Sequence, residues 1–412
     1  MRLNYKLLGE YIRQVDNRNK ELKVDLLLGV SIKKKFMPSI ANIVGTNMRT
    51  YKIIEQKQFA YGPVTSRNGD KISVSLLENH DQAIVSQTYT VFEIIDHNKL
   101  DPEYLMMWFR RPEFDRYARF KSHGSAREVF DWEEMCKVEL PVPSIEKQRE
   151  IVKEYNVISD RIKLNENLNQ KLEETAQAIY KHWFVDFEFP ISKEYAEEIG
   201  KPELEGKPYK SSGGEMIYCE ELEKEIPRGW KMDNLLNIAN YLNGLAMQKF
   251  EATEEDCLPV IKIRELNQGY TDSKSGKATL NIPKKYQVEN GDVIFSWSGT
   301  LKVDIWCGGL GGLNQHLFKV TSKQYPKWFY FLWTKNHLEN FIRIADGKKT
   351  SMGHIKREDL TESLVIIPKS RELLKMNLVM SKVFKKIILG KLYINQSNSL
   401  RELILSKMTK IS

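Results

Sequence analysis

Asp186, Glu205 and Lys207 are the residues whose types and spacing come nearest to a catalytic centre. The triplet Glu205-Gly206-Lys207 has the acidic-x-Lys form of some metal-dependent nucleases, in which carboxylates hold Mg²⁺ and the lysine helps to activate water. Such triplets are common by chance, and this one lies in the Pro/Gly/Ser-rich stretch from Gly200 to Gly214. The sequence therefore favours an interdomain linker here over a nuclease site.

Other catalytic motifs are missing from the sequence. It has no Gly-x-x-x-x-Gly-Lys-Ser/Thr loop of an ATP motor. It also lacks the Asn/Asp-Pro-Pro-Tyr/Phe segment with which amino-methyltransferases hold a flipped adenine. The glycine-rich run from Gly308 to Gly312 has the wrong spacing for a dinucleotide loop and predicts a tight turn. Any catalysis linked to this chain is therefore expected from other proteins.

Composition sets broad limits. The 412 residues include 41% hydrophobic residues, enough for two or more cores, and the net charge of +8 permits a polyanionic partner without requiring one. Cys136, Cys219, Cys257 and Cys307 stand singly, without metal-ligand spacing, which predicts reduced thiols in a cytoplasmic protein and no metal site. The N-terminus lacks the apolar core of a signal peptide, and no stretch reaches about 18 apolar residues, so neither export nor membrane insertion is expected.

The elements around these residues are predicted from a repeat of about 225 residues. Several anchors recur at a nearly constant offset, namely Asn68-Gly69-Asp70 with Asn290-Gly291-Asp292, Pro102 with Pro326, Pro143 with Pro368, and Tyr5-Lys6 with Trp230-Lys231. Each half is expected to be a globular domain followed by one long helix. The predicted fold class is α/β (α+β), with two pseudo-repeated domains separated by a long antiparallel two-helix coiled coil. The predicted ranges are 1–143 for domain 1, 144–189 for a central helix, 190–226 for a linker, 227–367 for domain 2 and 368–412 for a C-terminal helix.

Both predicted helices carry an apolar seam. The first spans Ser144 to Phe189 without Pro or Gly, and alternating steps of four and three residues define a coiled-coil seam. Its positions are Ile151, Tyr155, Ile158, Ile162, Asn165, Asn169, Leu172, Ala176, Ile179 and Trp183. The second helix has Gly390 as its only helix-weakening residue, and its seam is Met376, Met380, Val383, Ile387 and Ile394, with Leu400 and Leu403 resuming on a shifted face. An antiparallel pair would place the two domains at opposite ends of a rod.

Polar residues in the middle of these seams have two interpretations. Buried amides can set the register of a helix pair at some cost in stability, or they can help to seat helices of a partner. The aromatic run from Trp183 to Phe187 is expected to stay exposed enough to bind a partner. The candidate partner-binding residues are Asn165, Asn169, Trp183, Phe184, Phe187, Asn395 and Asn398.

Several segments resemble the specificity subunits of type I restriction-modification systems. The central helical region is similar in Pro143-Ser144-Ile145-Glu146-Lys147-Gln148-Arg149-Glu150-Ile151 and in the segment from Leu172 to Phe187. The segment Ile226-Pro227-Arg228-Gly229-Trp230 is similar to the start of the second target-recognition domain of this family, and Gly291 to Thr300 to a strand and turn within it. The whole chain fits the order recognition domain, helix, recognition domain, helix.

The resemblance implies a non-catalytic subunit that recognises DNA and assembles a complex. Each recognition domain would read one half of a split double-stranded DNA target, while the coiled coil sets the unread spacer and docks the partners. Two modification subunits would carry S-adenosylmethionine and methylate adenine, and restriction subunits would use ATP and Mg²⁺ to translocate and cut. This chain itself would bind no cofactor. About 40 helical residues would form a rod of about 60 Å, more than the roughly 34 to 36 Å between half-sites one DNA turn apart.

Residues for DNA contact are sought in loops rich in basic, amide, hydroxyl and aromatic groups, because these groups bind phosphates and base edges. In domain 1 the candidates are Tyr61, Thr65, Ser66, Arg67, Lys121, His123, Ser125 and Arg127. In domain 2 they are Trp297, Ser298, Thr300, Lys302, Asn314, Gln315, Lys348, Lys349, Thr350 and His354. We rank Arg127, Lys348, Lys349 and Thr350 highest, since their two loops occupy equivalent places in the repeat. The run Lys33-Lys34-Lys35 is a separate candidate for phosphate contact, or only a solvated cluster.

Two other functional classes stay open. The chain could be a self-contained DNA methyltransferase or nuclease, which the missing motifs oppose, or a coiled-coil scaffold without DNA recognition. The candidate loops and the helix ends differ between the two halves of the repeat, so the two domains are expected to read different half-sites of an asymmetric target.

Overall fold

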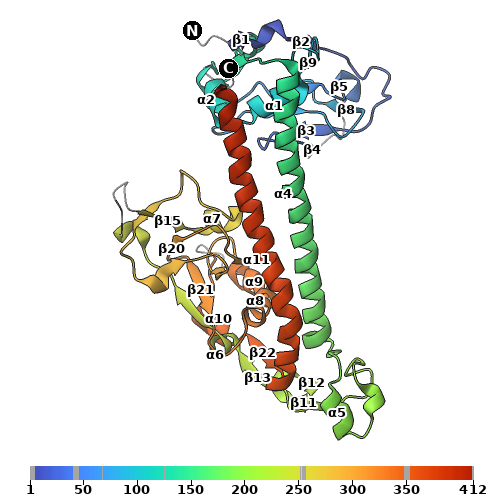
Figure 1. The fold of residues 1–412 in the computed structure, drawn as a ribbon, viewed down its shortest axis with the longest axis vertical. Helices are drawn as coiled ribbons and strands as arrows, with labels where there is room; N and C mark the ends of the chain where they lie inside the picture. Colours follow the sequence, from blue (N-terminus) through green and yellow to red (C-terminus); the bar gives the residue numbers. More distant parts are fainter. Residues whose placement is uncertain are drawn as a thin grey trace. The chain divides into compact units, whose positions relative to one another are not determined.

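The computed structural model describes residues 5–39, 46–66, 68–124, 127–250, 252, 257–347 and 353–410 of the chain. The chain divides into two compact units, Met1–Arg161 with Ser397–Ser412, and Ile162–Gln396. Each unit contains one domain of helices and sheets and a part of both long helices, α4 (Ile145–Tyr180) and α11 (Ser370–Lys407) (Figure 1). The predicted α/β (α+β) class with two repeated domains is confirmed.

The first unit is built on a four-stranded antiparallel sheet with smaller strand pairs beside it. The strand order of the sheet is β2 (Ile12–Val15), β9 (Thr90–Ile94), β6 (Phe59–Tyr61), β7 (Val74–Leu76). The pairs are β1 (Tyr5–Leu7) with β10 (Glu139–Pro141), β3 (Leu28–Val30) with β4 (Phe36–Pro38), and β5 (Lys52–Glu55) with β8 (Gln82–Val85).

Three short helices cover this sheet and complete its core, α1 (Pro102–Phe109), α2 (Pro112–Phe120) and α3 (Trp132–Cys136). Helix α1 begins where the Asp101 carboxylate accepts hydrogen bonds from the backbone N–H groups of Glu103 (2.9 Å) and Tyr104 (3.1 Å). A carboxylate at this position followed by proline favours helix initiation, because it satisfies free N–H groups and presets the backbone angle φ. Almost all of α1 is buried against the sheet, where the rings of Phe59 and Phe92 stack at 4.9 Å.

The second unit repeats this arrangement and adds a second sheet. Its first sheet has the order β14 (Asn240–Asn243), β21 (Leu317–Thr321), β18 (Val293–Ser296), β19 (Lys302–Ile305), all antiparallel. The second sheet has the order β16 (Lys277–Thr279), β15 (Cys257–Ile261), β20 (Gly311–Leu313), β17 (Gln287–Val288). Strand β13 (Lys231–Asn234) pairs with β22 (Leu364–Ile367), and the helices are α6 (Leu235–Ile238), α7 (Ile263–Gln268), α8 (Lys327–Asn336), α9 (Leu338–Gly347) and α10 (Arg357–Thr361).

The duplication is visible element by element. The sheet order β2-β9-β6-β7 returns as β14-β21-β18-β19, the helices α1 to α3 return as α8 to α10, and the pair β1-β10 returns as β13-β22. One sequence anchor is not equivalent, because Asn68-Gly69-Asp70 lies between β6 and β7 whereas Asn290-Gly291-Asp292 precedes β18. The structural counterpart of Gly291 is Lys57, two residues before β6, and both have left-handed backbone angles (φ 90° and 67°).

The range 190–226, predicted as a linker, is folded. It contains α5 (Lys193–Glu198) and the hairpin of β11 (Met216–Cys219) and β12 (Lys224–Pro227). Tyr209 stacks on Phe189 at 4.6 Å and belongs to the hydrophobic core of the second unit. The Gly, Pro and Ser residues thus form the turns of a small subdomain.

The long helices α4 and α11 pack together in antiparallel orientation. In the first unit, Ile151 and Tyr155 of α4 share a core with Leu405 near the end of α11. In the second unit, Tyr180 at the end of α4 shares a core with Met376 and Met380 in the first turns of α11. The seam predicted for α4 is buried or half-buried at every position. In α11 the prediction fails for Leu400 and Leu403, which are exposed, while Leu405 and Met408 are buried in their place.

Candidate nucleic-acid interface

Hydrogen bonds join two loops of the first domain that the sequence singled out, the β6–β7 loop (62–73) and the α2–α3 loop (121–131). The backbone N–H of Thr65 donates to the Glu128 carbonyl (2.9 Å), and that of Phe130 donates to the Pro63 carbonyl (2.8 Å). The Thr65 hydroxyl also donates to the Ser122 hydroxyl (2.9 Å). Gly124 bends the α2–α3 loop with a φ of 128°, in the left-handed region that favours glycine.

The candidate residues on these loops divide by exposure. Tyr61 and Thr65 are buried, so the prediction that they contact DNA is wrong for this conformation. Burial also raises the pKa of the Tyr61 hydroxyl. Ser66, His123 and Arg127 are exposed, and Lys121 is half-buried with its Nζ 3.7 Å from Glu134. Arg67 and Ser125 lie outside the described residues.

The Lys33-Lys34-Lys35 run does not act as one cluster. Lys34 is buried, and its Nζ lies 2.7 Å from an Asp115 carboxylate oxygen. Burial lowers the pKa of Lys34, and the nearby Asp115 charge opposes this shift. Lys33 and Lys35 are exposed on either side. The prediction of a phosphate contact is therefore wrong for Lys34 and stays open for its two neighbours.

The second domain assembles its candidate loops in the same way and adds a third. The β18–β19 loop (297–301) meets the α9–α10 loop, since the backbone N–H of Gly299 donates to the Gly353 carbonyl (3.2 Å) and that of Ile355 donates to the Trp297 carbonyl (3.1 Å). The β20–β21 loop (314–316) joins them through His316, whose Nδ1 lies 3.1 Å from the Ser298 hydroxyl. The Trp297 ring centroid lies 5.9 Å from that of His316 and 6.2 Å from that of His354.

Exposure again separates the candidates. Thr300 is exposed, and Trp297, Gln315 and His354 are half-buried at the surface of the cluster. Ser298 and Asn314 are buried and hold the loops together. Lys302 is engaged inside the domain, because its Nζ donates to the Leu266 carbonyl (3.1 Å) and lies 2.8 Å from Asp304. The prediction of a phosphate contact is therefore wrong for Lys302. The high-ranked Lys348, Lys349 and Thr350 lie outside the described residues.

The family model of the type I restriction modification DNA specificity domain matches residues 19–174 and 227–398. This chain belongs to the type I restriction-modification specificity family. The MjaIX specificity subunit of Methanocaldococcus jannaschii is 25% identical over 323 residues, 76% of this chain and 70% of that protein. The HindI specificity subunit of Haemophilus influenzae is 22% identical over 428 residues, 92% of each. The crystal structure of an S subunit from M. genitalium has the same fold, with a TM-score of 0.53, 12% identity, and coverage of 98% of this chain and 95% of that one.

Some surface residues of this specificity subunit were missed by sequence reasoning. The Trp297 indole N–H donates to Oδ1 of Asn243 (3.0 Å), and His316 links two loops, although neither was among the candidates. The β8–β9 loop is the first-domain counterpart of the β20–β21 loop and exposes Gln87 and Thr88. Aligning the strands of the repeat, rather than short motifs, would have identified this loop.

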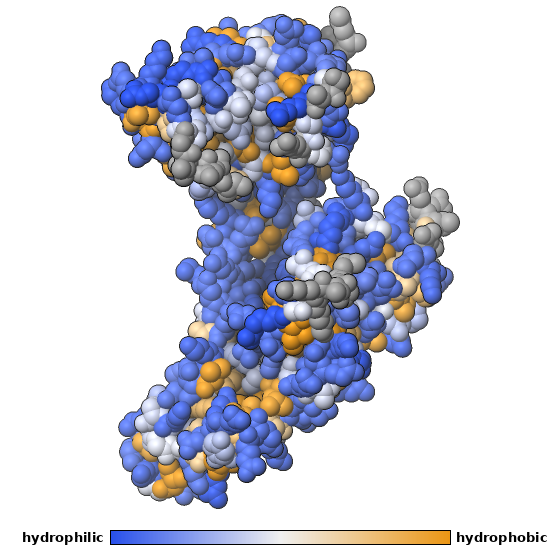
Figure 2. Space-filling view, turned by 180° about the vertical axis from the view of Figure 1, so that it is seen from behind, coloured by the Kyte–Doolittle hydropathy of each residue, from blue (hydrophilic) through white to orange (hydrophobic). Residues whose placement is uncertain are grey.

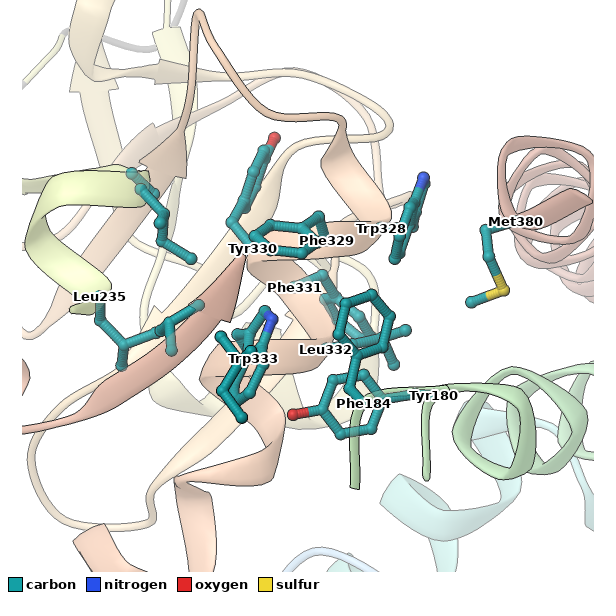
Figure 3. Close-up of a cluster of buried hydrophobic side chains, with 14 of the residues drawn as sticks. Tyr180, Phe184, Leu235, Trp328, Phe329, Tyr330, Phe331, Leu332, Trp333 and Met380 are labelled. Atoms are coloured by element: carbon teal, nitrogen blue, oxygen red, sulfur yellow. The ribbon is translucent and has the colours of Figure 1, made fainter. Parts of the chain in front are cut away.

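The aromatic run of the specificity subunit is internal. Trp183, Phe184 and Phe187 are 9%, 1% and 2% exposed, so the prediction that they stay accessible to a partner is wrong. After α4 the backbone forms a wider π-helical turn, Lys181–Val185. Figure 3 shows Tyr180 and Phe184 facing the aromatic side chains of α8, and the Phe184 and Trp333 ring centroids are 6.0 Å apart.

The seam asparagines also have partners within the chain or are buried. The side-chain N–H of Asn395 donates to the Cys307 carbonyl (2.9 Å), and Oδ1 of Asn398 accepts from Arg401 (2.8 Å). Asn169 is buried beside Gly390, and Asn165 is half-buried on the seam. These contacts favour the first of the two interpretations, in which the amides set the geometry of the helix pair.

Searches for two other kinds of site gave negative results within the described ranges. There, no three His, Cys, Asp or Glu side chains are placed to hold a metal ion together. In the same part of the chain, no helix is both long and apolar enough to cross a membrane.

Proposed function

We propose that this specificity subunit reads an asymmetric, bipartite double-stranded DNA target, with one half-site for each domain. The observation that carries the proposal is the matched pair of loop clusters. In both domains the loop after the third strand of the main sheet bonds to the loop after the second short helix. The side chains presented there differ, with His123 and Arg127 in one domain and Trp297, Gln315 and His354 in the other. A common scaffold with different base-edge chemistry supports two different half-sites.

The helix pair would dock the two modification subunits. Leu164 and Leu168 of α4 and Leu374, Leu378 and Leu389 of α11 are 50% to 67% exposed, although the inward seam is buried. A mostly apolar groove of about 280 Å³, lined in part by Trp328, Phe384 and Leu389, lies between α8 and α11. Hydrophobic patches interrupt an otherwise hydrophilic surface (Figure 2). Outward leucines at helical spacing support packing against helices of a partner.

Catalysis in this proposal belongs to the partners. The modification subunits would supply S-adenosylmethionine and methylate adenine, and restriction subunits would supply the ATP- and Mg²⁺-dependent translocation and cleavage. The missing catalytic motifs support a non-catalytic role for this chain. We place the assembled complex in the cytoplasm, where its DNA is found.

Two glycine substitutions test which domain reads which half-site. A Cβ on Gly124 would lie 2.2 Å from the Arg127 carbonyl oxygen, and a Cβ on Gly353 would lie 2.6 Å from that of Ala345. Gly124→Ala and Gly353→Ala should therefore each displace the loops of one domain. In matched controls, Gly29→Ala meets only the Tyr89 hydroxyl at 3.9 Å, and Gly347→Ala meets nothing within 4 Å.

The measurement is single-molecule sequencing of adenines methylated by each reconstituted complex. Each test variant should lose about tenfold in methylation, or lose base preference, at one half-site while the other stays intact. The two variants should affect opposite halves. Recovery of no split motif with the wild-type complex, or equal effects of one variant on both halves, would contradict the proposal.

A further inference from the structure

A cluster of charged side chains joins the second domain to both long helices. Nζ of Lys391 in α11 lies 3.2 Å from Oε1 of Glu173 in α4 and 2.5 Å from Oδ1 of Asp304 in β19. Lys302 contacts the other oxygen of Asp304 at 2.8 Å, and Lys335 of α8 lies 3.7 Å from Glu173. These five side chains are between 22% and 34% exposed. We call this cluster the polar latch.

Neighbouring contacts place the latch at the polar middle of the helix pair. One turn after Lys391, the Asn395 amide donates to the Cys307 carbonyl, two residues beyond the end of β19. One residue before Lys391, Gly390 packs against Asn169, which lies one turn before Glu173 on α4. Polar side chains of both helices therefore connect to each other and to the end of β19.

The second domain has another, separate attachment to the helices. Figure 3 shows this aromatic anchor, in which Tyr180 and Phe184 of α4 and Met380 of α11 surround Trp328 and Trp333 of α8. Met380 and Lys391 are eleven residues apart on α11, which corresponds to about 16 Å at 1.5 Å per residue. Contact at one point permits the domain to rock on the helices, whereas contact at two separated points opposes that motion.

The chemistry of the two attachments suggests different roles. An apolar cluster gains free energy from burial but accepts small sliding movements, since its contacts are not directional. A partly buried ionic cluster adds little net stability, because desolvation offsets attraction, yet it requires particular distances between its charges. The anchor can thus hold the domain on the helices while the latch sets its angle.

We infer that the polar latch makes the complex selective for one spacer length, by fixing the angle of the second domain on the helix pair. This inference rests on the proposed reading of a bipartite target. Lys391 and Asp304 are then positioning residues that touch no DNA. Without the latch, the second domain should still recognise its half-site but accept it at neighbouring spacings.

The test uses the full reconstituted modification complex and a spacer profile. Lys391→Met keeps the length of the side chain and removes its charge, and Lys391→Arg restores the charge. Methylated adenines are mapped on DNA carrying both half-sites at the native spacing and at one base pair more or less. The ratio of off-spacing to native methylation should rise about tenfold, one decade of discrimination, in Lys391→Met. It should return toward the wild-type ratio in Lys391→Arg.

Two controls separate positioning from general weakening. Lys323→Met removes an exposed charge from the second domain outside the latch, and Ile305→Val removes one methylene beside Asp304 without changing a charge. Neither should alter the spacer ratio. Asp304→Asn replaces Lys391→Met if that variant does not fold.

The inference is overturned if the latch variant keeps both half-sites and a wild-type spacer ratio, or if Ile305→Val broadens the ratio equally. A wild-type complex that shows no split motif would instead remove the proposed function, so the two failures are distinguishable.

Discussion

Gly390 is the position where one added methyl group should most disturb the helix pair. A Cβ at this position would lie 2.2 Å from Oδ1 and 2.8 Å from Nδ2 of Asn169. Asn169 is 6% exposed, and neither atom of its amide group has a hydrogen-bond partner in the described part of the chain. Glycine at 390 therefore leaves the space that the asparagine occupies, and the two residues should be energetically coupled.

The magnitude of the effect follows from opposing terms. Replacing a mid-helix glycine with alanine normally stabilises a helix by about 0.5–1 kcal/mol, whereas overpacking an interior costs about 1–3 kcal/mol. We expect Gly390→Ala to lower the free energy of unfolding by about 1 kcal/mol. Adding Asn169→Ala removes both the clash and two unpartnered polar groups, each of which costs about 1–3 kcal/mol. The double variant should exceed Gly390→Ala by about 2 kcal/mol and be at least as stable as the wild type.

A double-mutant cycle measures this coupling. The free energy of unfolding is obtained from urea titration of the wild type, both single variants and the double variant. Hydrogen exchange of α4 and α11 amides tests whether the change is local to the pair. Gly347→Ala is the control, because its Cβ would meet nothing within 4 Å. Single effects that add within about 0.5 kcal/mol would show that the residues are not coupled and would refute the reasoning.

Three further predictions concern the core, the latch and the outer helix surface. Phe184→Ala should cost about 3–5 kcal/mol in urea unfolding, whereas Val185→Ala, at a 44% exposed position, should cost little. Burial alone would raise the pKa of Asp304, but Lys391 and Lys302 outweigh it and lower that pKa from 3.8. The stabilisation from Asp304 should therefore be present above pH 3.8 and be lost as the pH falls through the lower folded-state pKa; an acid titration in which Asp304→Asn loses the same stability would contradict this. Leu378→Glu combined with Leu389→Glu should abolish co-elution with modification subunits in size-exclusion chromatography, while Leu310→Glu, at a 45% exposed position, should leave co-elution intact.

Sequence reasoning located what depends on local pattern. The seam of α4 was readable because steps of four and three residues place side chains on one face of any helix, whatever packs against it. The α2–α3 and α9–α10 loops were placed in equivalent positions because they follow elements that recur in the same order. Turn residues at these loops, such as Gly124, carry backbone requirements that are likewise local.

Burial of individual polar and aromatic residues could not be read in this way. Tyr61 and Thr65 belong to a loop with DNA-contacting chemistry, yet Tyr61 faces the core and Thr65 ties two loops together. Lys34 sits between two exposed lysines but reaches Asp115, a partner more than 80 residues away in sequence. The matching Asn-Gly-Asp triplets misled the repeat alignment, because turns with these residues occur before strands and between them. In each case a distant partner decides the role of the side chain.

The same physical distinction explains how this chain can keep one scaffold and read two sequences. The strand orders, the anchoring helices and the loop-to-loop hydrogen bonds recur in both domains, and most of these contacts are made by backbone groups and buried apolar side chains. Such contacts tolerate changes in the exposed side chains that the loops present, because those side chains contribute little to packing. His123 and Arg127 can therefore diverge from Trp297 and His354 without loss of the fold. The helix pair has less freedom, since Asn169, Gly390 and Lys391 each meet a specific partner, and change there should alter spacing rather than sequence preference.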